Sequence, residues 1–165
     1  VTHGLMALHM WGNHELAILD AKRALEQSPQ YNLALTLLGE AMSLSGNSEE
    51  GVPIIRKIME TTPKNLADFG PWRLALSCFA AEDYELALKA VDKALQFVRE
   101  MPPLKWTKAT ILVGQGRVDE AKALIVDLMS DYPEFNLTCV NTIMFKRPED
   151  GKRFLDGLRT AGVPD

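Results

Sequence analysis

Apolar residues recur along most of this chain at intervals of three and four positions, which is the spacing of one face of an α-helix. Residues 83–100, DYELALKAVDKALQFVRE, place a set of small and apolar side chains on one such face: Leu86, Ala87, Ala90, Val91, Ala94 and Leu95. Residues 32–46, NLALTLLGEAMSLSG, do the same with Leu35, Leu38, Ala41 and Met42. Because a half-buried strand requires strict alternation instead, the pattern predicts an all-α protein.

The helical stretches are repeated at a nearly constant interval. Three stretches begin at a glycine and end at a proline 17 positions later: Gly12 to Pro29, Gly46 to Pro63 and Gly116 to Pro133. Small residues inside these stretches keep the same period, since Ala17, Gly51, Ala87 and Ala121 are separated by 34, 36 and 34 positions. A fixed period of this size indicates stacked supersecondary units. We therefore expect four helix hairpins, the third lengthened by two residues within 63–72.

Local signals place the ends and the crossings of these helices. Three polar residues are expected to cap the N-termini of second helices: Asn13, Asn47 and Asp83. Gly39 and Ala75 in the first helices, opposite the small residues of the second helices, mark crossings too close for a larger side chain. Pro53 falls within the second helix of the second repeat. Because proline lacks an N–H and clashes with the preceding turn, we expect a kink or a delayed start there.

These repeats resemble tetratricopeptide repeats (TPR) over residues 1–133. The resemblance rests on the 34-residue period, Leu38-Gly39 and Leu74-Ala75, DYELAL at 83–88, Ala24 and Ala94, and the closing prolines. It implies a right-handed superhelical solenoid of antiparallel helix hairpins, with repeats at about 1–30, 31–64, 65–102 and 103–133. Gly51 and Pro53 depart from the family pattern.

Residues 134–165 are expected to form a degenerate repeat with a capping helix pair. Residues 134–146, EFNLTCVNTIMFK, predict a first helix. Residues 147–165 predict a final helix with Pro148 near its start and Gly162 as its C-cap. Its apolar stripe would consist of Phe154, Leu155 and Leu158, leaving the polar outer face that a solenoid cap requires.

Part of this tail is similar to a known group of signalling proteins. FLDGLRTAGVP, at 154–164, resembles the C-terminal end of TPR arrays in bacterial class III adenylate cyclases, and related arrays follow a winged-helix DNA-binding domain in some bacterial regulators. The resemblance implies that a catalytic or DNA-binding domain lies upstream. Since the chain begins at Val1, within a predicted helix, we expect a fragment of a longer protein.

The family resemblance also implies a partner-binding groove lined by the first helices. The candidate groove residues are Thr36, Glu40, Trp72, Arg73, Leu76, Phe79, Trp106 and Thr110, with Phe69 beside them. Trp72 and Trp106 are 34 positions apart, so they occupy equivalent sites in adjacent repeats. Two indoles beside Arg73 would suit an extended or helical peptide. Alternatively, both tryptophans pack between neighbouring repeats, or the final helix folds back and covers them.

One ligand of this family is disfavoured by the same residues. TPR domains that bind the C-terminal tails of chaperones clamp carboxylates with lysine and asparagine. The corresponding positions here hold Thr36, Glu40, Trp72 and Leu76. Arg73 is the only cation among the groove candidates, and Glu40 would repel an acidic tail. We therefore expect no carboxylate clamp.

Composition and charge narrow the function further. The net charge of −4, without a basic stripe, argues against nucleic acid as a partner. No apolar run is long enough for a membrane span and no signal peptide is visible, so we expect a cytoplasmic protein. Cys78 and Cys139 lack a CxxC partner and are expected to be buried free thiols.

No motif indicates chemistry. The spacing of His3, His9 and His14 turns them to different sides of a helix, and no carboxylate or cysteine set joins them. We expect no catalytic residue, no metal and no cofactor, and predict a non-catalytic module that binds a peptide or partner protein. The alternative is a regulatory C-terminal region of a larger bacterial signalling protein. A homodimer through the open first repeat is a third possibility.

Overall fold

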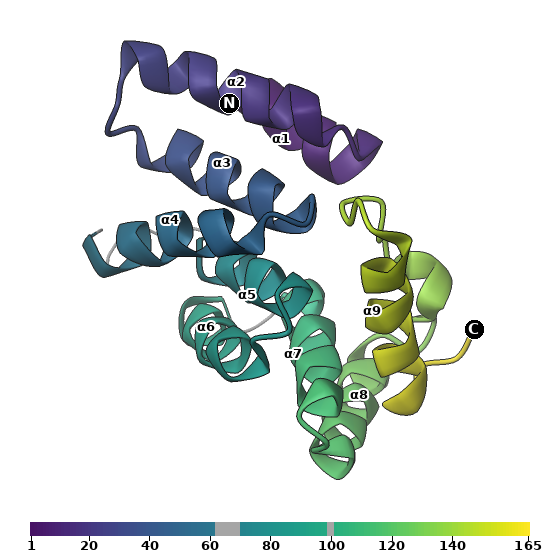
Figure 1. Ribbon diagram of the computed structural model, residues 1–165. Helices are drawn as coiled ribbons and strands as arrows, with labels where there is room; N and C mark the ends of the chain where they lie inside the picture. The colour runs from purple at the N-terminus through teal and green to yellow at the C-terminus, as the bar shows by residue number, and fades with distance from the viewer. Residues whose placement is uncertain (62–69, 99–100) are drawn as a thin grey trace.

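The protein is an all-α solenoid, and the computed structural model describes residues 1–61, 70–98 and 101–165 (Figure 1). The helices follow one another as antiparallel pairs: α1 (Thr2–Trp11) with α2 (His14–Gln27), α3 (Asn32–Leu44) with α4 (Ser48–Thr61), α5 (Gly70–Ala80) with α6 (Tyr84–Phe97), and α7 (Pro102–Gly114) with α8 (Val118–Asp131). A short 3-10 helix, η1 (Leu137–Cys139), and α9 (Pro148–Thr160) complete the described chain. The expected all-α class and the solenoid are confirmed. The limits of the repeats stay a prediction, because residues 62–69, where the second repeat meets the third, lie outside the described residues together with the expected insertion.

Two of the expected N-caps make the hydrogen bond that defines a cap. The Asn13 side chain accepts from the Leu16 backbone N–H at 3.0 Å, and the Asp83 side chain accepts from that of Leu86 at the same distance. Each bond satisfies an amide of the first turn that has no partner within the helix. Asn47 directly precedes α4, as predicted. Gly46, in the turn before it, has a φ of 103°, a backbone conformation that favours glycine.

The predicted close crossing of α3 and α4 is confirmed at Gly39 and Gly51. A Cβ atom on Gly51 would lie 2.3 Å from the Gly39 carbonyl oxygen, and one on Gly39 would lie 2.7 Å from the Gly51 carbonyl oxygen. Both distances are shorter than any real contact, so only glycine fits at either position. The alanines at the equivalent crossings, Ala17, Ala75, Ala87 and Ala121, are fully buried.

Pro53 does not delay the start of α4. The helix begins at Ser48, 34 positions after the start of α2, and continues through Pro53 to Thr61. The delayed start is therefore wrong, whereas the kink stays a prediction. Proline is tolerated because Pro53 is exposed and lies near the N-terminus of the helix, where the carbonyl left without a donor belongs to exposed Glu49 and can be hydrated.

The helix expected over 134–146 is wrong. Only Leu137–Cys139 is helical, as η1, and the rest of this segment consists of turns and extended chain. Asn136 and Asn141 each accept a hydrogen bond at 2.9 Å from the backbone N–H two residues later, which replaces a helical bond with a local turn. The final helix α9 begins at Pro148 as predicted, and Gly162 follows its end with a φ of 101°.

The tail, residues 134–165, turns back across the solenoid instead of extending it. Figure 1 shows α9 beside α7 and the loop before α9 reaching toward α1 and α2. In that loop Lys146 N–H donates to the Leu44 carbonyl at 3.0 Å, and His14 Nε2 lies 2.8 Å from the Met144 carbonyl oxygen. The tail therefore contacts all four hairpins, and a cavity lies between it, α5 and α7.

Candidate functional site

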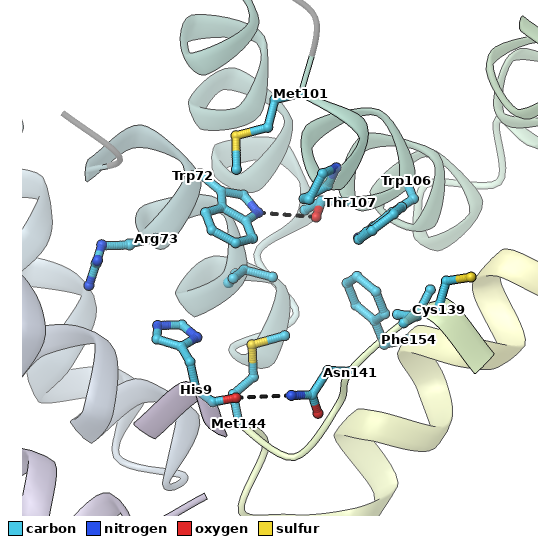
Figure 2. Close-up of a pocket in the computed structure, with 13 residues that line it drawn as sticks. His9, Trp72, Arg73, Met101, Trp106, Thr107, Cys139, Asn141, Met144 and Phe154 are labelled. Carbon is cyan, nitrogen blue, oxygen red and sulfur yellow. Dashed lines mark hydrogen bonds between the residues drawn. The ribbon is translucent and has the colours of Figure 1, made fainter. Parts of the chain in front are cut away.

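The candidate site is a cavity of about 460 Å³ between α5, α7 and the tail (Figure 2). α5 contributes Trp72, Arg73 and Leu76, and α7 contributes Pro103, Trp106 and Thr107. The tail closes the opposite side with Cys139, Val140, Asn141, Met144 and Phe154, while His9 and Met101 complete the lining. Most of these side chains are apolar and two are indoles. This size and lining are typical of sites that receive an apolar group.

The two tryptophans lie on this cavity, and each is fixed on one side by a neighbour. Trp72 Nε1–H donates to Thr107 Oγ1 at 3.2 Å, so Trp72 also packs against the next hairpin. The His9 ring stacks on Trp72, with ring centroids 6.4 Å apart. Trp106 stacks almost parallel on Phe135 of the tail, at 5.0 Å and 5°. Both indoles are only partly buried, so each keeps surface for a ligand.

Arg73 is not a free cation in this site. Its Nη1 lies 2.8 Å from Glu40 Oε2, and His9 Nε2 lies 3.2 Å from Glu40 Oε1. Glu40 is fully buried, and burial acts to raise the pKa of its carboxyl, but the charges of Arg73 and His9 outweigh burial and hold that pKa below its usual value. Because Arg73 is paired with Glu40, it is not available to clamp a carboxylate of a ligand.

The other expected groove residues are buried away from the cavity. Thr36 donates to the Asn32 carbonyl of its own helix at 2.8 Å, and Phe79 packs edge-to-face on Phe154 at 5.2 Å. Thr110 donates to the Phe154 carbonyl at 3.3 Å. Thus four expected residues meet at the cavity, namely Trp72, Arg73, Leu76 and Trp106, and four do not, namely Thr36, Glu40, Phe79 and Thr110. Phe69 lies outside the described residues. A role of any of them in binding a partner stays a prediction.

Sequence reasoning placed no residue of the tail among the site candidates. Val140 and Met144 belong to the segment 134–146, which the sequence predicts as a helix, and Phe154 belongs to the final helix, whose folding back over the tryptophans is one of the predicted alternatives. No motif or repeat position in the sequence marks Phe135 as part of the site. The one available clue was the apolar stripe of α9, whose Phe154 and Leu158 are 1% and 0% exposed and therefore needed a surface to pack against.

The remaining candidates for chemistry are accounted for individually. Cys78 is buried as expected, and burial raises the pKa of its thiol to about 12. Cys139 is exposed, so the expectation of its burial is wrong.

The three histidines have separate contacts. His3 Nδ1 lies 2.7 Å from Asp20 Oδ2, His9 lies beside Glu40, and His14 lies beside the Met144 carbonyl. Within the described ranges, no three metal-ligating side chains come together. No helix among those ranges combines the length and apolarity of a membrane span.

No protein-family model and no curated protein sequence matches this chain. Among solved structures, it is similar to MamA MSR-1 C2, a TPR-containing protein, with a TM-score of 0.65 and 15% sequence identity. The match covers 97% of this chain and 91% of the other. At this identity the likeness shows a shared fold alone, which is a TPR-like all-α solenoid.

Proposed function

We propose that this chain is a non-catalytic interaction module that binds a peptide or partner protein at the cavity between Trp72 and Trp106. The observation that carries the proposal is the apolar cavity of about 460 Å³, walled by indoles from equivalent positions of two adjacent hairpins. The TPR-like fold supports the general role, because stacked hairpins present a concave surface for partners. No cofactor enters this proposal.

The chemistry of the walls indicates what the ligand contributes. Both basic side chains at the cavity, His9 and Arg73, face Glu40, so the site does not favour a ligand that depends on a carboxylate. Apolar or aromatic side chains of a partner would bury against the indoles and against Met101 and Met144. Tryptophan is among the residues that most often dominate binding energy, and its truncation typically costs about 2 kcal/mol or more. With a net charge of −4, nucleic acid is not the proposed ligand.

Selection of peptides on the immobilised chain tests this proposal. A random peptide-display library should yield sequences with large apolar residues whose binding is weakened in the Trp72→Ala/Trp106→Ala double variant. Trp11→Ala is the matched control, because Trp11 is 50% exposed and does not line the cavity. Circular dichroism should show the same helicity in all variants. Equal affinity for the wild type and the double variant would discard the cavity as the binding site.

A second candidate is a regulatory C-terminal region of a larger bacterial signalling protein, such as an adenylate cyclase or a winged-helix regulator. The resemblance of residues 154–164 motivates it, and in the structure these residues form most of α9 and the turn after it. Deleting the array from a protein that contains it should then change the activity of the linked domain. Unchanged activity would count against this regulatory role. We also propose a cytoplasmic location for the protein.

Self-association is proposed only for the outer side of α1. Met6, Met10 and Trp11 are 43%, 61% and 50% exposed on this helix, and exposed apolar side chains that gather on one surface mark interaction sites. Light scattering over a dilution series should show a mass that falls toward the monomer if a homodimer forms through this face. A constant monomer mass would remove the homodimer.

A further inference from the structure

The concave side of the third and fourth hairpins already holds a helix, α9. Its inner stripe consists of Phe154, Gly157 and Leu158, all of which are buried, and buried Ala161 follows directly after the helix. A Cβ atom on Gly157 would lie 3.0 Å from Thr110 Cγ2 of α7, so the glycine permits a close helix-to-helix approach. Phe154 inserts beside Phe79 of α5, at 5.2 Å between ring centroids. These contacts are those of an amphipathic helix bound in a groove.

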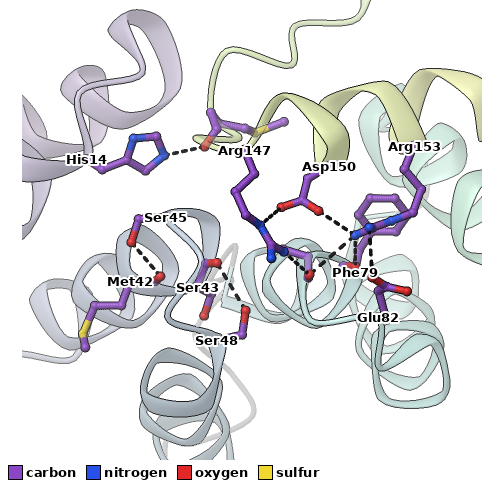
Figure 3. A network of polar contacts seen from close by, with 12 residues as sticks. His14, Met42, Ser43, Ser45, Ser48, Phe79, Glu82, Arg147, Asp150 and Arg153 are labelled. Carbon is purple, nitrogen blue, oxygen red and sulfur yellow. Dashed lines mark hydrogen bonds and ion pairs between the residues drawn. The ribbon is translucent and has the colours of Figure 1, made fainter.

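A charged cluster, which we call the latch, fastens this helix at its N-terminal end. Asp150, with 1% of its side chain exposed, lies between Arg147 Nε at 2.7 Å and Arg153 Nη2 at 2.9 Å (Figure 3). The same arginines reach the end of α5, where Arg147 Nη2 donates to the Ala80 carbonyl at 3.0 Å and Arg153 Nη2 to the Phe79 carbonyl at 3.1 Å. Cations are favoured at a helix C-terminus, whose last carbonyls lack partners within the helix.

The latch depends on Asp150 because this carboxylate orients both arginines. Replacing one member of a buried ionic cluster leaves the others without compensation, which is costly. The loop before α9 makes further contacts of its own: Asn141 Nδ2–H donates to the His9 carbonyl at 3.0 Å, Lys146 N–H donates to the Leu44 carbonyl at 3.0 Å, and Phe135 stacks on Trp106. A helix from another protein could supply the same apolar stripe and the same arginine contact, but it would have to take the place of α9 against Phe79 and Thr110.

We propose that the tail is an intramolecular ligand of the concave surface, and that the external partner is an amphipathic helix that replaces α9 when the latch opens. The partner helix carries α9's contact pattern: an arginine, an aromatic residue directly after it, a glycine three positions on and an aliphatic residue one position later. This rests on the proposed function and names both the class of partner and its regulation. A helix is preferred over an extended peptide because the segment seated on this surface is itself helical.

A labelled peptide tests the exchange on the full chain. The probe is a fluorescein-labelled synthetic peptide of residues 147–164, and its binding is compared for wild type, Asp150→Asn and Asp156→Asn. Asp156 is the matched control, because it lies on the same helix and pairs with Lys152 and with Arg159 at partly exposed positions. We expect Asp150→Asn to bind the peptide at least about tenfold more tightly than the other two, since opening the latch raises the fraction of binding-competent chain. A peptide with Phe154→Ala should lose this binding. Equal binding to all three chains, or to none, would overturn the proposal.

Hydrogen exchange separates displacement of the tail from general unfolding. In Asp150→Asn the amide of Lys146 should exchange faster, while amides in the middle of α3 and α6 keep their wild-type protection. If protection is lost throughout the chain, α9 is an inseparable cap and the proposal is wrong. If peptides selected from the library bind through Trp72 and Trp106 while the α9 peptide never competes with the tail, the interaction function stands and only this inference fails.

Discussion

Arg73 on α5 and Glu40 on α3 form an ion pair, with 2.8 Å between Nη1 and Oε2, across the contact between the second and third hairpins. Both residues are among the groove candidates that the sequence predicts. Instead, the side chain of Glu40 is fully buried, and Arg73 is 9% exposed to solvent. The pair explains why the concave surface can carry a carboxylate and a guanidinium at its centre and still present an apolar wall.

Removing the cation of this pair should destabilise the fold. In Arg73→Met the carboxylate of Glu40 loses its arginine partner and keeps His9, and breaking a buried pair in this way typically costs about 3–5 kcal/mol. Urea unfolding followed by circular dichroism measures the loss. Lys89→Met is the matched control, because its partner Glu85 lies in solvent, and it should change stability far less. Equal stability of Arg73→Met and the wild type would contradict the assigned role.

The stability of the fold should fall in acid partly through Glu40. Its carboxyl has a folded-state pKa below the ordinary value of 4.5, so the stabilisation is present above pH 4.5 and is lost as the pH falls through the lower folded-state pKa. Glu40→Gln cannot ionise and should therefore show a weaker pH dependence below pH 4.5, although it is less stable at pH 7. Urea unfolding of both chains between pH 3 and pH 7 checks the sign. A steeper acid dependence in Glu40→Gln would be incompatible with this assignment.

Gly51→Ala should destabilise the α3–α4 hairpin. The added methyl group would lie 2.3 Å from the Gly39 carbonyl oxygen, which forces the helices apart, and overpacking of this kind typically costs about 1–3 kcal/mol. Gly151→Ala is a useful comparison, because a Cβ there would lie 3.4 Å from Thr142 Cβ, an ordinary contact. Alanine is the better helix former, so Gly151→Ala should be neutral or stabilising. The midpoint of thermal unfolding should therefore fall in Gly51→Ala, and in Gly151→Ala it should stay at the wild-type value or rise.

The two thiols should differ sharply in reactivity. Cys139 is exposed at the edge of the cavity, whereas burial raises the pKa of the Cys78 thiol to about 12, so Cys78 is uncharged at pH 8. Titration of the native chain with Ellman's reagent at pH 8 should therefore detect one fast thiol, and a second only in urea. Two fast thiols in the native chain would show that the α5–α6 packing is looser than described.

What the sequence could predict depended on how local each feature is. The caps at Asn13 and Asp83 and the crossing at Gly39 and Gly51 are set by neighbouring residues and by the repeat period, and both were predicted correctly. The pairing of Arg73 with Glu40 could also have been foreseen, because the two are 33 positions apart, almost one period.

The path of the tail could not be predicted in the same way. Asn136 and Asn141 form local turns that compete with a helix, but the apolar residues of 134–146 also fit helical spacing, so the local pattern does not decide between the two. The contacts that fix the path, such as Met144 with His14 and Phe135 with Trp106, join residues brought together only by the folded solenoid. The repeat period therefore predicts the wall of the candidate site that α5 and α7 form. It does not predict the wall that the tail forms.

The most direct test of the central claim is the indole N–H spectrum of the ¹⁵N-labelled chain during titration with a library-selected peptide. The chain has three tryptophans, and Trp11 on α1 lies outside the cavity, so it serves as an internal reference. We predict that the resonances of Trp72 and Trp106 shift together with one saturation curve while that of Trp11 stays in place. Saturable binding that leaves both cavity indoles unshifted would contradict the assignment of this cavity as the interaction site.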